Sequence, residues 1–286
     1  MGQLSKEPLS LGKVGYLNVL PIFYPLEAGI VPHPFAIVHG TPAYLCGLMA
    51  RGELDVGVVS SIEYARHPDR YFILPDLSIS CCGAVKSVML FSSVPLERLA
   101  GQSILVTTQS HTSVALLKVL FSQYLGIDVA YRSGSCTEAL AKDPSPVAFL
   151  AIGDEALRLR RQEAYPYRLD LGEAWHTWTG LPFVFAAWLI QRQTIERWSA
   201  NLGPAIRALT RAKEWGLAHL ERVCSEGAKQ GVLSHNELEE YYAGFSFGLS
   251  ETEQQGLELF FRYLFAMGEI DRLPCLEVFS PVAYVA

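Results

Sequence analysis

The sequence contains no cysteine or histidine spacing typical of a metal site. Its six cysteines (46, 81, 82, 136, 224 and 275) include no Cys-x-x-Cys, and its seven histidines include neither His-x-x-x-His nor His-Glu-x-x-His. Cys81 and Cys82 are adjacent, and reduced thiols are the simplest interpretation of such a set. We therefore expect no metal centre and buried, reduced cysteines in a cytoplasmic protein.

Signatures of nucleotide binding are absent as well. No P-loop and no dinucleotide fingerprint follows the first expected strand, so we expect no nucleotide cofactor. We expect no Gly-x-Ser-x-Gly nucleophile elbow, so nucleophilic catalysis has little support in the sequence. His111 and His176 remain candidate general bases, although histidines in turns more often make structural hydrogen bonds. Asp154, at an expected helix start, is interpreted first as a cap.

Positive charge and long apolar runs are both scarce. The chain has 23 Lys and Arg against 29 Asp and Glu, a net charge of −6, without a basic block. This balance argues against a nucleic-acid partner. The longest uncharged apolar run, 180–190, is too short to span a bilayer. Residues 1–10 include Lys6 and Glu7 and lack the apolar core of a signal peptide, so we expect no membrane partner and a cytoplasmic location.

What the sequence does contain is a repeated strand–helix alternation over 286 residues, half of them hydrophobic. Strands are expected at 11–15, 35–38 and 54–59. Thr41 followed by Pro42 predicts a helix start, and Gly52 predicts its end. Ser60 and Ser61 are expected to cap the next helix. The order strand–helix–strand predicts a parallel sheet.

The alternation then continues in a second unit. Strands are expected at 103–107, 129–132 and 147–152, and helices after Ser110 and around 137–142 and 153 onward. From Thr194 the chain is expected to be almost wholly helical, with capping boxes at Ser234 and Ser250. Apolar stripes are expected on two helices, with members Leu116, Leu117, Leu120, Phe121 and Tyr124, and Leu257, Phe260, Phe261, Leu264 and Phe265.

The stretch 179–188 joins apolar residues to the polar segment 170–178, which we expect to be a turn. Such a strand leaving a polar turn is typical of a ligand pocket. The apolar strands expected at 85–91 and 182–190 would carry the chain out to the second unit and back. They predict lobe one at residues 1–92 and 190–286, lobe two at 93–189, and a cleft between them.

Small hydrogen-bonding residues follow the expected strands of both units. Parallel strands place their carboxyl ends at one edge of a sheet, where ligands bind. Several of these residues also open helices, whose free N–H groups suit a carboxylate or phosphate. The set comprises Asn18, Thr41, Ser60, Ser61, Ser110, Thr112, Ser113, Gly153 and Asp154.

Five segments together resemble the menaquinone-biosynthesis family of the futalosine pathway. They are Gly15-Tyr16-Leu17-Asn18 with Pro21, Gly83 to Val88, Ser110 to Ser113, Ile152 to Leu157 and Trp178 to Val184. The Tyr-Leu-Asn opening resembles the chorismate dehydratase branch. The branch that makes 1,4-dihydroxy-6-naphthoate typically opens with a Ser-Pro-Cys-Pro-Asn-Asp type segment, which is absent here.

This resemblance implies an α/β fold of the type II periplasmic-binding-protein kind, with two lobes, mixed but mostly parallel sheets and a helical C-terminal region. It also implies a lyase that dehydrates chorismate without metal or organic cofactor, the substrate's own carboxylate acting as base. The sister naphthoate synthase and a non-catalytic small-anion-binding protein remain alternatives. Oligomeric state is left open.

Residue roles follow from the same resemblance. Asn18 and Ser87 are expected to be catalytic, and Ser110, Thr112 and Ser113 to hold the ring carboxylate. The remaining expected substrate-binding residues line the cleft: Thr41, Ser61, Gly153, Thr179 and Gly180.

Overall fold

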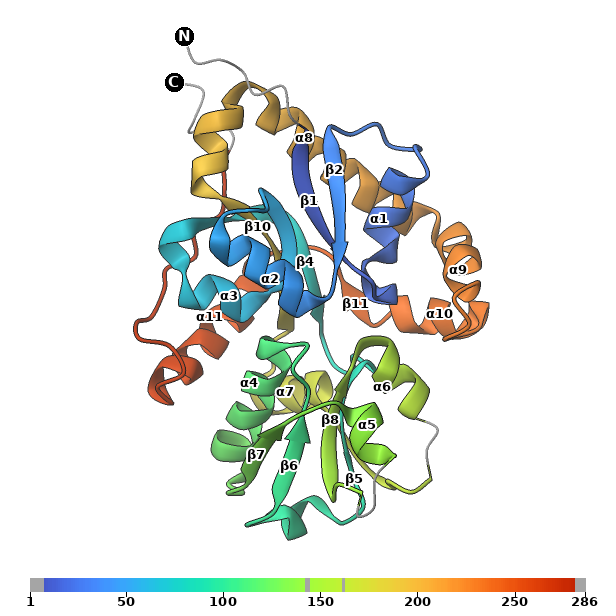
Figure 1. Cartoon of the computed structure of the whole chain (residues 1–286), viewed down its shortest axis with the longest axis vertical. Helices are drawn as coiled ribbons and strands as arrows, with labels where there is room; N and C mark the ends of the chain where they lie inside the picture. Colours follow the sequence, from blue (N-terminus) through green and yellow to red (C-terminus); the bar gives the residue numbers. More distant parts are fainter. Residues whose placement is uncertain (1–7, 142–144, 161–162, 281–286) are drawn as a thin grey trace.

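The chain folds into two sheets, each flanked by helices, one above the other along the longest axis (Figure 1). In this computed structural model the described residues are 8–141, 145–160 and 163–280, apart from the side chains of 199–201. Two parts of the sequence predictions lie outside the described residues. They are residues 1–7, where no signal peptide is expected, and Lys142, at the end of an expected helix.

The larger sheet has six strands in the order β11-β4-β10-β3-β1-β2. Its strands are β1 (Leu9–Val14), β2 (Phe35–Gly40), β3 (Val56–Ser60), β4 (Tyr71–Cys81), β10 (Phe183–Gln191) and β11 (Phe245–Ser246). Its helices are η1 (Leu17–Val19), α1 (Leu20–Glu27), α2 (Pro42–Arg51), α3 (Ser61–Arg66), η2 (Pro68–Arg70), α8 (Arg192–Ala218), α9 (Leu220–Ala228), α10 (His235–Tyr242) and α11 (Glu251–Ala266).

The smaller sheet has five strands in the order β7-β6-β8-β5-β9. Its strands are β5 (Val88–Ser92), β6 (Ser103–Val106), β7 (Ala130–Ser133), β8 (Ala148–Ile152) and β9 (Tyr167–Asp170). Its helices are η3 (Leu96–Leu99), α4 (His111–Val119), the π-helical turn η4 (Leu120–Leu125), α5 (Cys136–Leu140), α6 (Gly153–Leu159) and α7 (Leu171–Thr179). The α/β type with two sheets and a helical C-terminal region is as predicted.

Both sheets are mixed, as predicted. β1 pairs in parallel with β2 and β3, and β6 in parallel with β7 and β8. β10 runs antiparallel to both β3 and β4, and β5 antiparallel to β8 and β9. The antiparallel strands are those next to the passages between the sheets, because a chain that leaves one sheet and returns to it must reverse direction.

Helix caps were predicted well where the cap is a short polar side chain. The Thr41 hydroxyl accepts the Tyr44 N–H, and Gly52 ends α2 with φ at 72°. Ser234 and Ser250 both form capping boxes. Ser60 and Ser61 are different: Ser60 occupies the N-cap of α3 without a side-chain cap bond, and the Ser61 hydroxyl donates to the Val184 carbonyl.

The segment expected to be a polar turn before the apolar strand is a helix. Residues 171–179 form α7, because the Asp170 carboxylate accepts the N–H groups of Gly172 and Glu173 as N-cap. Gly180, with φ at 72°, ends the helix. Trp175 is fully buried on the inner face, which gives this short helix its packing side.

Sheet membership also moves the expected lobe boundaries. β5 lies wholly in the smaller sheet and β10 wholly in the larger one, so neither strand crosses. The outgoing strand is β4, which the sequence analysis did not identify. We therefore place the two passages at residues 82–87 and 180–182, about five to ten residues before the boundaries expected at 92/93 and 189/190.

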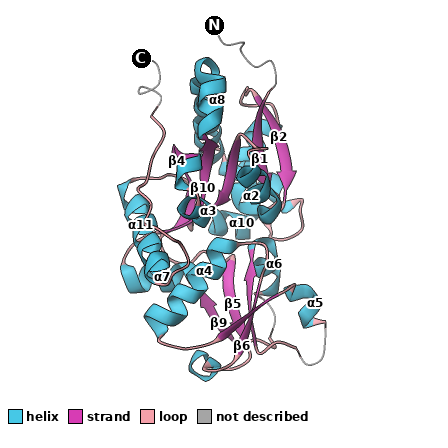
Figure 2. Ribbon diagram, turned by 60° about the vertical axis from the view of Figure 1, so that its left-hand side comes forward, coloured by secondary structure: helices cyan, strands magenta, loops and turns pink. Residues whose placement is uncertain are grey.

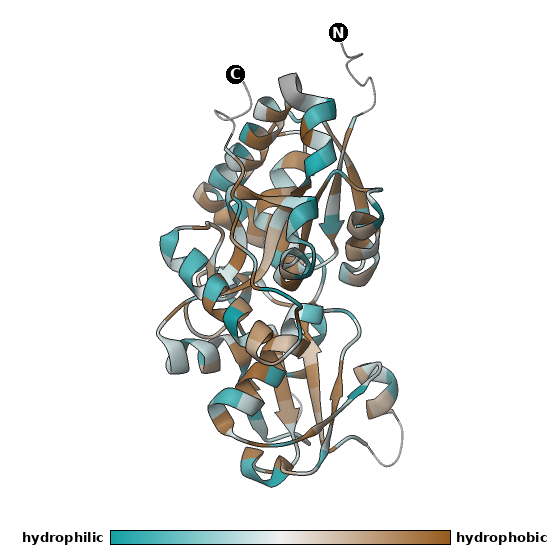
Figure 3. Cartoon of the chain, turned by 90° about the vertical axis from the view of Figure 1, so that its left-hand side faces the viewer, coloured by the Kyte–Doolittle hydropathy of each residue, from teal (hydrophilic) through white to brown (hydrophobic). Residues whose placement is uncertain are grey.

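One apolar core runs through both lobes. Buried residues of each sheet belong to the same cluster, and Trp175 of lobe two packs edge-on against Phe183, Phe260 and Tyr263. Figure 3 shows the strands mostly apolar and the outer helix faces more polar. The two expected stripes are buried except at their last members, Tyr124 (38% exposed) and Phe265 (49% exposed).

All six cysteines are free, but two of them, Cys82 and Cys275, are exposed rather than buried. Within the described ranges, no helix combines the length and apolarity needed to cross a bilayer.

Candidate functional site

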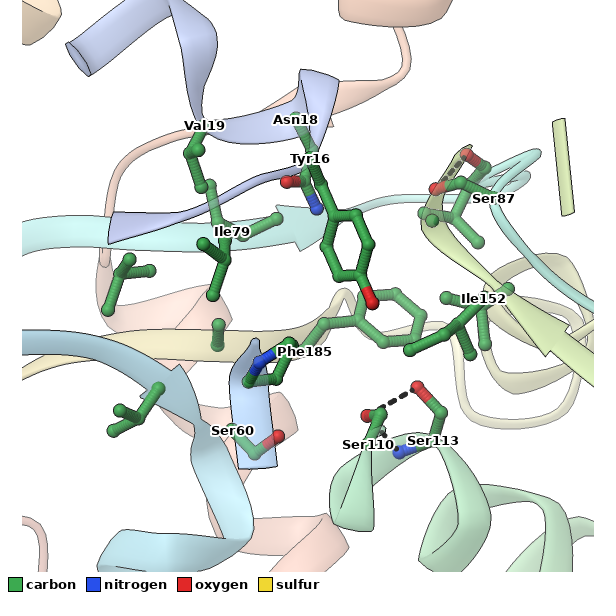
Figure 4. A pocket seen from close by; sticks show the side chains of 18 of the residues that line it. Tyr16, Asn18, Val19, Ser60, Ile79, Ser87, Ser110, Ser113, Ile152 and Phe185 are labelled. Atoms are coloured by element: carbon green, nitrogen blue, oxygen red, sulfur yellow. Dashed lines mark hydrogen bonds between the residues drawn. The ribbon is translucent and has the colours of Figure 1, made fainter. Parts of the chain in front are cut away.

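A cavity lies between the two lobes, at the carboxyl ends of strands from both sheets (Figure 4). It encloses about 600 Å³ of space free of protein atoms, part of it continuous with solvent. Asn18 follows β1, Ser60 ends β3, Ser110 follows β6 and Gly153 follows β8. The prediction that these strand ends meet is confirmed for these four positions.

Asn18 is the polar lining residue whose side chain most clearly lacks a hydrogen-bond partner. It lies in η1, the short helix between β1 and α1, and lines the cavity. Its side-chain oxygen is buried and has no hydrogen-bond partner among the described residues. A buried amide without a partner costs about 1–3 kcal/mol. A polar group of a ligand bound in the cavity would supply that partner.

Ser110 and Ser113 form a small hydroxyl pair at the start of α4. The Ser110 hydroxyl accepts the Ser113 N–H as N-cap and donates to the Ser113 oxygen at 2.9 Å (Figure 4). Because the Ser113 oxygen already accepts, its own proton is left to point elsewhere. Both residues line the cavity, so this proton and the free N–H groups at the helix start are available to an anion there.

Ser87 lines the cavity from the passage between β4 and β5, and only 1% of it is exposed. Its carbonyl accepts the Gly153 N–H at 2.7 Å, so it is joined to the β8–α6 junction. Within the passage its hydroxyl contacts only the Val85 carbonyl, at 3.4 Å.

Tyr16 was quoted in the sequence motif but not expected as a site residue. Figure 4 shows its hydroxyl pointing into the cavity, toward Phe185 and Ile152. Burial, with Asp154 and Glu155 nearby, raises the pKa of Tyr16 to about 12, so the phenol keeps its proton. Its ring lies against Gly153, where a Cβ atom would be 2.8 Å from it. The Tyr-Leu-Asn motif could have indicated this residue.

The rest of the lining is apolar. Strand residues supply most of it, from the ends of β1, β3, β4 and β10 that face lobe two. Phe185 and Ala186 lie in the stretch 179–188, which the sequence associates with a ligand pocket. The other apolar lining residues were not predicted: Val14, Val19, Pro42, Val58, Val59, Ile79, Val85, Val88, Ile152 and Phe245.

Five expected substrate-binding residues do not line the cavity. Ser61 and Thr112 lie just behind it at the seam between the lobes, where Thr112 accepts the Ile62 N–H at 3.1 Å. Thr41 caps α2, and only its neighbour Pro42 reaches the lining. Thr179 and Gly180 end α7, and the Thr179 hydroxyl donates to the Trp175 carbonyl instead.

Neither candidate histidine base faces the cavity. His111 lies 3.4 Å from the Arg66 guanidinium, and burial followed by that positive charge lowers the pKa of His111. His176 contacts Cys82 Sγ at 3.6 Å and the Leu181 carbonyl at 3.4 Å. Asp154, expected as a helix cap, accepts the Leu17 N–H from the other lobe at 3.3 Å.

Contrary to the expectation of no such motif, the sequence contains one Gly-x-Ser-x-Gly stretch, Gly244 to Gly248. It does not form a nucleophile elbow, because Ser246 lies in β11 and donates its hydroxyl to Glu253 at 2.9 Å. No group of three or more His, Cys, Asp or Glu within the described residues could hold a metal ion.

Comparison with known proteins adds to this geometry. The family model described as menaquinone biosynthesis matches residues 9–266. The chain belongs to this family. A chorismate dehydratase of Thermus thermophilus is 33% identical over 272 residues, covering 88% of this chain and 94% of the relative. A chorismate dehydratase of Campylobacter jejuni is 32% identical over 180 residues, 61% of this chain and 64% of the relative.

Solved structures extend the fold beyond the family. A structural-genomics protein of Archaeoglobus fulgidus superposes with a TM-score of 0.73 at 17% identity, covering 93% of this chain and 99% of that one. The periplasmic aliphatic sulphonate binding protein of Escherichia coli superposes with a TM-score of 0.67 at 14% identity, covering 97% and 93%. The periplasmic-binding-protein fold expected from the sequence is confirmed.

Proposed function

We propose that this member of the menaquinone-biosynthesis family is a carbon–oxygen lyase that dehydrates chorismate to 3-[(1-carboxyvinyl)oxy]benzoate. Two relatives at 32–33% identity carry the name chorismate dehydratase. The observation that carries the mechanism is the character of the cavity. Among its described lining residues there is no acidic or basic side chain and no histidine.

A cavity without a titratable base suits a substrate that brings its own. In the proposed step the enolpyruvyl carboxylate of chorismate takes the proton from ring C3. The C–H electron pair becomes the third double bond of the ring and the C4–O bond breaks. The 4-hydroxyl takes the proton back from the newly formed carboxylic acid and leaves as water, which regenerates the carboxylate. Aromatisation drives the step, so the protein need only hold a reactive geometry, which is worth about 7–11 kcal/mol.

We infer that the hydroxyl and amide groups of the cavity supply that geometry. Ser113 and the start of α4, arranged by Ser110, would hold the ring carboxylate. Asn18 would use its unpartnered amide on the reacting region, and Ser87 would donate to the leaving hydroxyl from the opposite side. Tyr16 would add a phenol donor to a carboxylate. The apolar walls would exclude water and strengthen each of these hydrogen bonds.

This set of donors would also allow an acidic protein with no arginine among its described lining residues to bind a dianion. Neutral donors fixed before binding need little reorganisation. The remaining expected substrate-binding residues, Thr41, Ser61, Thr112, Thr179 and Gly180, would then act on ligand only through the residues they support.

The direct test is incubation of the purified protein with chorismate, followed by chromatography. Disappearance of chorismate with appearance of the enolpyruvyl benzoate is the expected result. Chorismate that is bound but unchanged would instead favour a binding protein. Chorismate that is neither bound nor consumed would favour the naphthoate-synthase branch.

The intramolecular base has its own test. Chorismate methylated on the enolpyruvyl carboxylate has lost the proposed base, whereas the ester of the ring carboxylate keeps it. We expect the first ester to compete with chorismate without reacting and the second to be dehydrated slowly. Dehydration of the first ester would contradict the substrate's role as base.

We further propose a cytoplasmic location and no metal or organic cofactor. Six free cysteines, two of them exposed, suit a reducing compartment.

A further inference from the structure

A buried tyrosine from the C-terminal part of the chain is hydrogen-bonded to Ser87. Tyr241 lies on α10, and its phenol donates to the Ser87 oxygen at 2.9 Å. Only 2% of Tyr241 and 1% of Ser87 is exposed, so this hydrogen bond is shielded from bulk water. The contact joins positions 154 residues apart in the sequence.

This hydrogen bond restricts where the Ser87 proton can point. A serine hydroxyl has one proton to donate, and here its oxygen already accepts from Tyr241. Burial raises the pKa of Tyr241, which keeps the phenol protonated and in the donor role. The acceptor left to Ser87 within the protein is the Val85 carbonyl, and 3.4 Å is long for a hydroxyl donor. The other direction open to the proton is the cavity that Ser87 lines.

The tyrosine ring is itself held in place. It packs edge-on against Phe245, a cavity-lining residue, with 4.9 Å between the ring centres. The Tyr242 ring lies at a tilt to it, with 5.6 Å between the ring centres. Lys86, next to Ser87, has a positive φ of 62°, and its N–H donates to the Asp170 carboxylate. Backbone and hydroxyl of the Ser87 segment are thus fixed from two different sides.

We propose that Tyr241 is a positioning residue that turns the Ser87 hydroxyl toward the substrate, so that Ser87 donates a hydrogen bond to the reacting region. The inference rests on the proposed function, because it needs Ser87 to act on chorismate. Tyr241 does not line the cavity and acts only through Ser87.

The test is a double-mutant cycle on chorismate turnover with Y241F, S87A and the Y241F/S87A pair. Y241F removes one oxygen atom and keeps the buried ring. We expect it to lower kcat roughly three- to tenfold with KM little changed, the loss of one hydrogen bond in the transition state. In the S87A background the same change should have no further effect on kcat.

A matched control separates positioning from general destabilisation. Tyr165 is also buried, and its phenol donates to the Pro146 carbonyl at 2.8 Å, away from the cavity. Y165F should lower the melting temperature about as much as Y241F while leaving kcat unchanged.

The outcomes of the cycle are distinct. An equal loss of kcat from Y241F with and without Ser87 would overturn the inference, because the tyrosine would then act independently of the serine. No loss from Y241F where S87A is impaired would overturn it too. If the unaltered protein does not consume chorismate, the proposed function itself fails, and this inference fails with it.

Discussion

At the scale of single residues, the site depends on polar groups that lack a partner inside the protein. Asn18 is the clearest of them, with a buried side-chain oxygen that no described residue satisfies. Ser113 accepts a hydrogen bond from the Ser110 hydroxyl, and no described residue accepts its own proton. Ser87 accepts from the Tyr241 phenol, and its proton has only the long 3.4 Å contact to the Val85 carbonyl within the protein.

Replacing Asn18 by alanine tests this arrangement. We expect N18A to lower kcat by about 10²-fold, the effect of removing one well-placed polar contact to a transition state. The melting temperature should stay the same or rise slightly, because the variant removes a buried group that has no partner. Steady-state kinetics and thermal unfolding measure the two effects. Near-normal turnover in N18A would contradict a role for the amide in catalysis.

His176 provides the control at this scale. It belongs to the same region of the sequence as the apolar strand β10, but its ring contacts Cys82 and Leu181 rather than the cavity. We expect H176A to change kcat by less than about threefold, as a surface change does. An inactive but folded H176A would instead identify the histidine as the base.

At the scale of elements, the junction between β8 and α6 matters because it contacts the segment that follows β1. Gly153 has a positive φ of 56°, and a Cβ there would meet the Tyr16 ring at 2.8 Å. We expect G153A to lower stability by about 1–2 kcal/mol from backbone strain and also to reduce turnover by displacing Tyr16.

Gly126 is a matched control for that substitution. It too has a positive φ, 67°, but a Cβ at this position would have no neighbour within 4 Å. G126A should show a similar fall in unfolding free energy and unchanged kinetics. If both glycine variants lost turnover equally, the Tyr16 contact would not be the cause.

The start of α7 holds a second junction, between lobe two and the passage that contains Ser87. The Asp170 carboxylate accepts four N–H groups: Gly172 and Glu173 in α7, and Val85 and Lys86 in the passage. Burial raises the pKa of Asp170, and these N–H donors oppose the rise.

Removal of this carboxylate leaves all four donors without their acceptor. We expect D170A to lower the free energy of unfolding by about 2–4 kcal/mol, more than an ordinary N-cap. Ser135, the N-cap of α5, accepts only the Glu138 N–H and serves for comparison. S135A should cost about 1 kcal/mol. Equal losses measured by urea unfolding would mean that Asp170 acts only as a cap.

At the scale of the whole molecule, several contacts hold the lobes together around the cavity. Lys118 on α4 pairs with Glu269 at 2.6 Å, and Arg160 beyond α6 pairs with Glu237 on α10 at 2.7 Å. Trp178 of α7 stacks on Tyr263 of α11 at 4.8 Å between ring centres. Figure 2 shows α11 beside α4 and α7 on one side of the molecule.

The composition of the cavity predicts how activity depends on pH. Tyr16, with a pKa of about 12, keeps its proton at all moderate pH values, and no described lining residue titrates near neutrality. The pKa of His111 is lowered, so this ring is neutral at pH 7 and above. We therefore expect kcat to be constant from about pH 7 to 9 and to fall only in acid, as the substrate carboxylate takes up a proton.

A kcat profile that rises through a pKa near 6.5 would contradict this expectation, since it would indicate a histidine base. Repeating the profile with H111Q and H176A would then show which histidine is responsible.

The sequence by itself determined what depends on neighbours along the chain. Thr41, Ser234 and Ser250 cap their helices as predicted, because a cap is a contact over three residues. The alternation of strands and helices determined the α/β class. The motif around Asn18, together with the other matching segments, was enough to indicate the family.

The tertiary structure alone decided what depends on contacts between distant segments. The packing of the two lobes selected the apolar walls, because the strand ends that form them come from both sheets. The Asp170 cap turned an expected loop into α7, and the pairing of β5 and β10 moved the lobe boundaries. Tyr241 reaches Ser87 from 154 positions away, and only the packing of α10 against the passage between the lobes brings them together.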